Sequence, residues 1–234
     1  VRSNPGVLHL QNGTIKQKVH WNDLDKLQLP ELENAKPNLD FNLKQRLDSI
    51  AVLDQRYRKL MQAKTPEERA ELGEDMGLTP EEYNGDLWSM QTVIDSSNML
   101  FVEKVFNMGY PGKSVVGEPT NTAAWYVLQH NPDKIGKYLP LIKEAGKNDE
   151  IPFRLVAMME DRYLMNQEKP QVYGTQGRTY NDERGSFIWP IENPETVNQR
   201  RKEAGFDQTI EEYAKLLFGD DFQYEVKTIE DVKQ

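Results

Sequence analysis

Charged and polar residues recur at positions where helical spacing predicts a buried face. Asp54 lies seven residues after Leu47 and four after Ile50, in the middle of an apolar stripe. Residues three or four apart share one face of a helix, and a carboxylate buried there is costly unless it has a partner. Arg58, one turn further on, is the expected partner, either in a structural ion pair or in a functional site.

Three other predicted helices also turn a polar group inward. Asn98 and His130 follow apolar residues at helical spacing, Asp95 flanks the stripe that contains Asn98, and Asp161 faces inward on its own helix. Each has a structural interpretation when taken singly, since an imidazole can cap the C-terminal end of a helix and a buried amide can satisfy a backbone group. The coincidence of four helices predicts a shared polar pocket.

A segment without helical period is expected to close this pocket. Residues 171–179 read QVYGTQGRT and interrupt the series of helices. Strand-forming residues from Val172 to Tyr180, the turn sequence NDERG and the apolar run SFIWPI predict one short β-hairpin near 171–191.

An enzyme of the hydrolase or lyase type is one class of function that fits these residues. His130 would be the general base, and Asp161 or Asp95 would orient it or serve as the acid. Arg58 or Arg162 would hold an anionic group of the substrate. The catalytic residues expected are therefore His130, Asp161 and Asp95, and the binding residues expected beside them are Asp54, Arg58, Asn98, Arg162, Tyr173 and Gln176.

A non-catalytic structural or protein-interaction module is the alternative. The polar cluster would then only fix helix packing, or bind a small molecule or peptide, with His130 as a buried hydrogen-bonding residue. The partner expected from either class is an unidentified small molecule or peptide, and the sequence carries no signal for an oligomeric state.

No cofactor and no metal are expected. The chain has no cysteine, and one inward histidine with scattered acids forms no recognised ligand spacing. The sequence GYPGKS at 109–114 resembles a phosphate loop, but Asn107 stands where the first glycine of that motif is needed, and a predicted helix precedes it. We therefore reject a nucleotide site of this type.

The elements that would position these residues are mostly helices. The periodicity predicts a mainly α fold, a single domain of about seven to eight helices over residues 42–220. Residues 1–41 form an extended arm or small appendage, with a turn favoured at Asn12-Gly13, and residues 221–234 form a C-terminal tail. The sequence TPEE at 65–68 and 79–82 predicts two helix starts, with threonine as N-cap and proline in the first turn.

Charge and hydropathy limit the partners. With 29 basic and 38 acidic residues the net charge is −9, which argues against a nucleic-acid or anionic-membrane binder. No apolar run approaches the ~18 residues that a membrane span needs. The sequence opens on Val1 and not on methionine, so we expect N-terminal processing. A periplasmic or cell-surface location is slightly favoured over a cytoplasmic one.

Several ordered motifs resemble a bacterial family defined only as a domain of unknown function. They are LDQRYR at 53–58, DSSN at 95–98, GYPG at 109–112, AWYVLQH at 124–130, EDRYL at 160–164, YGTQ at 173–176 and PIENPETVNQRRKEAGF at 190–206. The resemblance covers roughly residues 43–218. It implies a mostly helical domain whose shared polar positions include the residues named above, and no assigned reaction. Asn193 departs from the acidic residue expected after PIE.

Overall fold

The structure is a computed structural model that describes residues 6–11, 14–20, 39–182 and 184–232. The contacts divide the chain into two compact units, residues 1–38 and 39–234. In the first unit, β1 (Gly6–Gln11) and β2 (Thr14–His20) pair antiparallel, with Val7 opposite Val19. The expected turn residues Asn12 and Gly13 lie outside the described residues.

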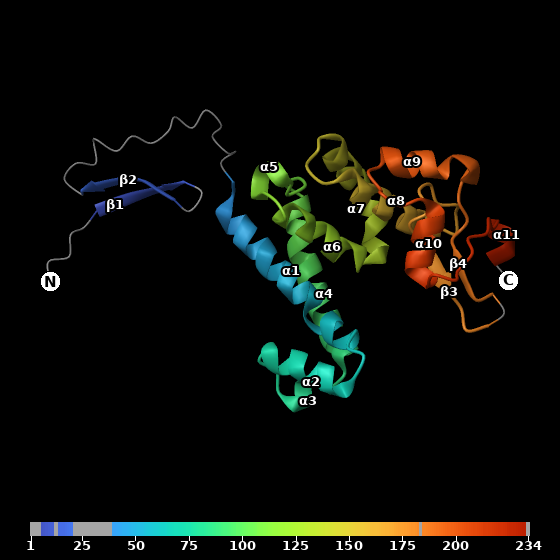
Figure 1. The fold of residues 1–234 in the computed structure, drawn as a ribbon, viewed down its shortest axis with the longest axis horizontal. Helices are drawn as coiled ribbons and strands as arrows, with labels where there is room; N and C mark the ends of the chain where they lie inside the picture. The colour runs from blue at the N-terminus through green and yellow to red at the C-terminus, as the bar shows by residue number, and fades with distance from the viewer. Residues whose placement is uncertain (1–5, 12–13, 21–38, 183, 233–234) are drawn as a thin grey trace. The chain divides into compact units, whose positions relative to one another are not determined.

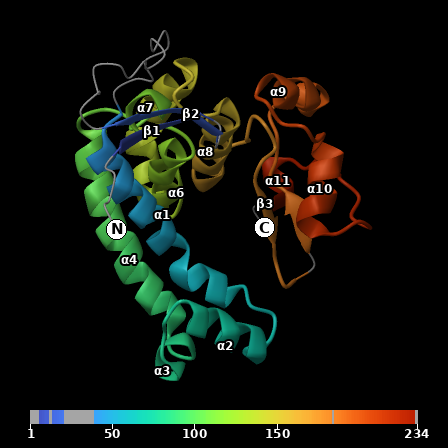
Figure 2. The same cartoon turned by 60° about the vertical axis from the view of Figure 1, so that its left-hand side comes forward.

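Two long helices form one side of the second unit. α1 (Phe41–Met61) and α4 (Leu87–Phe106) lie side by side in both ribbon views (Figures 1 and 2). Between them in sequence come α2 (Pro66–Asp75) and α3 (Pro80–Tyr83). The side chains of Thr65 and Thr79 cap these helices, as the two TPEE sequences predicted, because each hydroxyl accepts a backbone N–H of the first turn.

The main hydrophobic core lies where α1 and α4 meet the following helices. These are α5 (Lys113–Val116), α6 (Ala123–Gln129), α7 (Pro132–Lys147) and α8 (Phe153–Asn166). The sequence of α6 is apolar nearly all round, and Trp125, Val127 and Leu128 are almost completely buried. The indole Nε1 of Trp125 donates to the carbonyl of Leu155, 2.9 Å away, which joins α6 to α8.

The C-terminal part of the chain builds a second, smaller core. It contains the hairpin of β3 (Gly177–Thr179) and β4 (Ser186–Ile188), with Arg178 opposite Phe187, and then α9 (Val197–Glu203), α10 (Ile210–Phe218) and α11 (Ile229–Val232). Short 3₁₀ turns at Thr120–Thr122 and Pro194–Thr196 precede α6 and α9. Val232 packs with Phe187 and Trp189 of the hairpin.

The mainly helical fold with a short hairpin is confirmed, with two corrections of detail. The described residues contain eleven α-helices and not seven to eight, because one-turn helices such as Lys113–Val116 and Ile229–Val232 are too short to show a hydrophobic period. The first strand of the hairpin, β3, begins at Gly177 and not at Val172. Residues 172–175 are held by side-chain hydrogen bonds instead of strand pairing.

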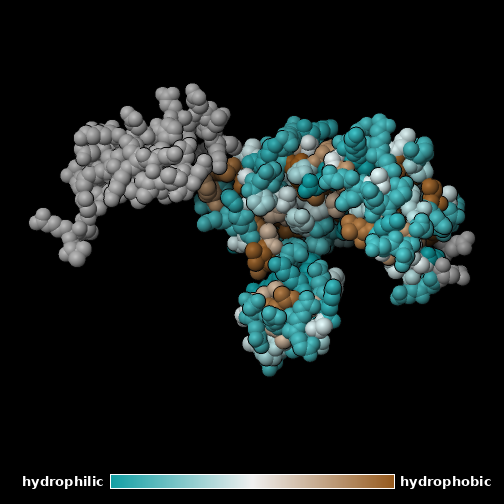
Figure 3. All heavy atoms as spheres, in the orientation of Figure 1, coloured by the Kyte–Doolittle hydropathy of each residue, from teal (hydrophilic) through white to brown (hydrophobic). Residues whose placement is uncertain are grey.

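The surface of the second unit is mainly polar. In the view of Figure 3 hydrophilic residues cover most of the coloured surface, with small hydrophobic areas between them. Among the described residues, no helix is long and apolar enough to cross a membrane.

Candidate functional site

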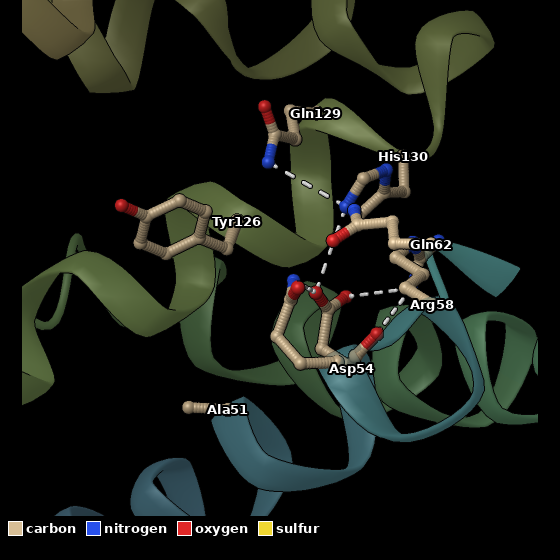
Figure 4. Close-up of a pocket in the computed structure, with 8 residues that line it drawn as sticks. Ala51, Asp54, Arg58, Gln62, Tyr126, Gln129 and His130 are labelled. Carbon is tan, nitrogen blue, oxygen red and sulfur yellow. Dashed lines mark hydrogen bonds and ion pairs between the residues drawn. The ribbon is translucent and has the colours of Figure 1, made fainter. Parts of the chain in front are cut away.

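A pocket of about 430 Å³ lies against α1 and the C-terminal end of α6. Its walls are built from two helical faces, as the close-up shows (Figure 4). The lining residues are Ala51, Asp54, Gln55, Arg58 and Gln62 from α1, and Tyr126, Gln129 and His130 from α6 and its C-cap. Their spacing of three and four residues places each set on one side of its helix.

Asp54 is the most deeply buried polar group of this pocket. Its side chain is 1% exposed. Oδ2 accepts a hydrogen bond from Nε2 of Gln55 at 2.7 Å. Oδ1 has no hydrogen-bond partner in the described part of the chain and lies 3.5 Å from Nη1 of Arg58. Burial raises the pKa of Asp54 to about 6, against the lowering effect of the Arg58 charge.

His130 is the C-cap residue of α6 and its side chain is 24% exposed. Its Nε2 lies 3.5 Å from Oδ2 of Asp54 and 3.5 Å from Nε2 of Gln129. Burial and the nearby positive charges of Arg58 and Arg162 lower the pKa of His130 to about 4. At neutral pH the imidazole is therefore uncharged, while Asp54 is mostly ionised. The two groups do not form a charged ion pair there.

Arg58 is held on several sides and has little freedom to bind a ligand. Nη1 and Nη2 donate to the two carboxylate oxygens of Asp95 at 2.9 and 2.6 Å. Nη1 also donates to the backbone carbonyl of Asp54. Such a two-point guanidinium–carboxylate pair fixes both side chains. It joins α4 to α1 directly beneath the pocket.

Gln91 completes this network, although the sequence analysis did not include it among the site residues. It is 1% exposed, its Nε2 donates to Oδ1 of Asp95 at 2.9 Å, and its Oε1 accepts the backbone N–H of Tyr57 at 3.0 Å. Its position four residues before Asp95 was the available signal, because it puts both side chains on the same face of α4.

Asp161 lies in a different environment. Its side chain is completely buried, and its carboxylate accepts the backbone N–H groups of Val172, Tyr173 and Thr175 at 2.7 to 3.0 Å. It also accepts the hydroxyl of Thr175 at 2.9 Å. Burial raises the pKa of Asp161, and these hydrogen bonds act in the lowering direction. All of these hydrogen bonds fasten residues 172–175 to α8.

Buried side chains fix the same segment from its other sides. The amide of Gln171 donates to the carbonyls of Gln176 and Trp189, and its Oε1 accepts the backbone N–H of Gln176. Arg201, which is 1% exposed, donates to the carbonyl of Tyr173 at 2.9 Å, and the hydroxyl of Tyr213 donates to that of Thr175. Gln171, Thr175 and Arg201 were missed by sequence reasoning, because their partners are distant in the chain.

The structure thus divides the predicted cluster into two groups. It brings together Asp54, Arg58, Asp95 and His130 in the first group, and Asp161, Tyr173 and Gln176 in the second. Within the described chain, no hydrogen bond or ion pair joins His130 to any member of the second group.

The remaining two predicted residues belong to neither group. Nη1 of Arg162 lies 3.4 Å from the carbonyl of Gln129, and burial lowers the pKa of the guanidinium. Asn98 is buried in α4 as expected, and its Nδ2 has no hydrogen-bond partner among the described residues. Over the same residues, no group of three or more histidine, aspartate or glutamate side chains lies close enough to hold a metal ion.

The second unit is a mainly helical domain in which the Arg58–Asp95 pair joins α1 to α4 beside a pocket lined by α1 and α6. The comparison with known families then assigns the chain. It belongs to a family of unknown function, DUF6624, whose match covers residues 79–227, more than half of the sequence. Comparison with curated proteins and with solved structures gives no match.

Proposed function

We propose that this chain is a small-molecule-binding domain with a hydrolase-like site, in which Asp54 accepts and returns the proton and His130 assists through a hydrogen bond. The observation that carries the proposal is the state of the Asp54 carboxylate. It is almost fully buried and lines an open pocket, and one of its oxygens, 3.5 Å from Nη1 of Arg58, has no hydrogen-bond partner among the described residues. Buried polar groups in a purely structural role normally have their hydrogen bonds satisfied.

The roles in this proposal differ from those expected from the sequence. Asp54 is the general base, because a pKa of about 6 lies close to the pH at which proton transfer is most useful. His130, with its pKa near 4, is a weak base and acts through a hydrogen bond from its ring to the reacting water or hydroxyl. Arg58 and Asp95 position Asp54 and do not touch the substrate.

The proposed reaction is hydrolysis of an ester bond by a water molecule held beside Asp54. The carboxylate accepts one proton of this water as the oxygen attacks the substrate. The proton then passes to the departing oxygen, so the carboxylate is restored after each turnover. A water-activating group of this kind contributes about 10²- to 10⁴-fold to the rate.

The test uses p-nitrophenyl acetate and p-nitrophenyl butyrate as chromogenic ester probes, followed between pH 4 and pH 8. We expect the wild-type rate to rise through about pH 6, to fall at least tenfold in Asp54→Asn, and to remain unchanged in Glu144→Gln, an exposed position on α7. If the wild type hydrolyses every probe no faster than Asp54→Asn does, the catalytic proposal is wrong.

A structural module is the second candidate, and one observation favours it. The partly buried Arg58–Asp95 pair and the buried Gln91 join two helices, which is what a packing network does. If Asp54 and His130 belong only to that network, Asp54→Asn and His130→Gln should lower the melting temperature as much as Arg58→Gln does. Melting temperatures that are unchanged or raised, together with lost hydrolysis, would support the enzyme.

A further inference from the structure

The charges around the α1–α6 pocket are unfavourable for an anionic ligand. Arg58 is the only lysine or arginine among its lining residues, and both of its terminal nitrogens are already bound to Asp95. Asp54 adds a negative charge at neutral pH, and His130 adds no positive one. A phosphate or carboxylate placed here would lie beside the Asp54 carboxylate, and the lining residues offer it no unpaired cation.

The uncharged polar groups of the pocket are mainly carboxamides. Gln55, Gln62 and Gln129 all line it, and a carboxamide presents two donor hydrogens and an acceptor oxygen. Gln55 and Gln129 each use one nitrogen within the site, and the Gln62 side chain makes no hydrogen bond with the described residues. The pocket therefore offers donors and acceptors side by side.

Tyr126 adds an aromatic wall to these polar groups. Its side chain is 40% exposed although it lies on the most buried helix of the core. The Tyr126 ring packs edge-to-face against the ring of Trp125, with 5.2 Å between the ring centroids. This contact fixes the orientation of the Tyr126 ring. An exposed aromatic ring beside carboxamides can pack against the C–H face of a ligand whose edges carry hydrogen-bonding groups.

We infer that the ligand of this pocket is an uncharged, hydroxyl-rich small molecule, of the size of a mono- or disaccharide. A hydroxyl group both donates and accepts, so adjacent hydroxyls can donate to Asp54 and accept from a neighbouring glutamine. The volume of about 430 Å³ lies within the usual range for small-molecule sites, roughly 300–1,000 Å³. This inference rests on the proposed function, since it takes the pocket to be a binding site.

The test is a titration of the whole chain by NMR, with the imidazole signals of His130 as the reporter. The chain has three histidines, and the spectrum of His130→Gln assigns the reporter. The uncharged probes are glucose, N-acetylglucosamine and cellobiose. Glucose 6-phosphate and glucuronate are the anionic counterparts, and a blocked dipeptide amide represents a peptide ligand.

We expect at least one uncharged sugar to shift the His130 signals saturably, and its anionic counterpart to bind at least tenfold more weakly. Tyr126→Ala should weaken sugar binding at least tenfold, whereas Glu144→Gln should leave it unchanged. Tighter binding of the anionic sugars, binding of the peptide amide alone, or no shift with any probe would each overturn the inference.

The two proposals fail separately in these experiments. Sugar binding without hydrolysis of any probe would remove the catalytic role of Asp54 and leave the ligand class intact. The opposite result is hydrolysis that depends on Asp54 together with preferential binding of anions or of the peptide amide. It would remove the ligand class and leave the catalytic role of Asp54 intact.

Discussion

The carboxylates of Asp54 and Asp161 are almost equally buried, but their surroundings differ. Asp161 accepts three backbone N–H groups and one hydroxyl, and all of these donors come from residues 172–175. Asp54 accepts one hydrogen bond, from a side-chain amide, and borders a pocket. Its other oxygen has no hydrogen-bond partner among the described residues. Burial raises the pKa of both groups.

The difference teaches that burial alone does not identify a functional carboxylate. The hydrogen-bond donors around Asp161 are fixed by the chain itself, so this group stabilises the fold and has no capacity left for a ligand. The donors around Asp54 are incomplete, so it carries a desolvation cost that a ligand or a proton can relieve. Substitutions in the Asp161 region and in the Asp54 region test this contrast.

Asp161→Asn should have the largest effect. The new amide nitrogen replaces an acceptor with a donor that faces backbone N–H groups, and this leaves buried donors unsatisfied. We expect a loss of about 4 kcal/mol in the free energy of unfolding, or about 8 to 16 °C in melting temperature. Circular dichroism melts at pH 7.5 measure it, and a change below about 2 °C would contradict the structural role of Asp161.

Asp54→Asn, the same substitution in the other region, should stabilise the protein at neutral pH. The folded-state pKa of about 6 lies above the ordinary aspartate pKa of 3.8, so the folded protein binds the proton more tightly. The stabilising effect of this bound proton is complete below pH 3.8 and is lost as the pH rises through 6. Asparagine stays neutral, so we expect it to match the wild type at pH 4 and to gain up to about 3 kcal/mol at pH 7.5.

His130→Gln should show the opposite pH dependence. The folded-state pKa of about 4 lies below the ordinary histidine pKa of 6.5, so protonation favours the unfolded chain. Stability from the neutral ring is complete above pH 6.5 and is lost as the pH falls through 4. The variant should therefore match the wild type at pH 7.5 and be more stable by up to about 3 kcal/mol at pH 4.

Both variants are compared with the wild type at each pH, since the other carboxylates titrate alike in all three proteins. Parallel melting curves for the two variants across pH 4 to 7.5 would show that Asp54 and His130 do not carry these shifted pKa values.

Thr175→Val should have a smaller effect on the closed region. The valine keeps the shape of the side chain but removes the hydroxyl that donates to Asp161 at 2.9 Å. A hydrogen bond to a buried charged group contributes about 2 kcal/mol, so a fall of about 4 to 8 °C is expected. Thr175→Ser is the matched control, because it retains the hydroxyl. If serine destabilises more than valine, packing of the methyl group outweighs the hydrogen bond.

Gln62→Ala should have the smallest effect on stability. This residue is exposed on the pocket side of α1, so the free energy of unfolding should change by less than about 0.5 kcal/mol. Sugar binding, measured by the His130 signals, should nevertheless weaken severalfold. A large loss of melting temperature would indicate that the open region is also part of the packing.

The sequence predicted well what depends on one helix at a time. Helical spacing identified Asp54, Asn98 and Asp161 as inward-facing, and all three are buried. Threonine caps at Thr65 and Thr79 were also predicted correctly, because they need only the next three residues. Local geometry determines these features, so a single sequence contains the information.

What the sequence did not reveal depends on contacts between distant residues. The spacing along α8 does not show that Asp161 contacts residues 172–175. The spacing along α6 likewise does not show that His130 contacts α1. The segment at 171–176 has strand-forming residues, but its N–H groups bind Asp161 and Gln171, so it does not continue the strand. Long-range hydrogen bonds outweighed local propensity there.

The family match begins at residue 79, whereas α1 ends at Met61. A recombinant fragment cut at the start of the match would keep Asp95 and His130 but lose Asp54 and Arg58, so a binding or activity screen of that fragment would report on half a site. It would also uncover the core residues that pack against Leu47 and Ile50. The cloning boundary for this domain therefore belongs at Leu39, ahead of the first helix.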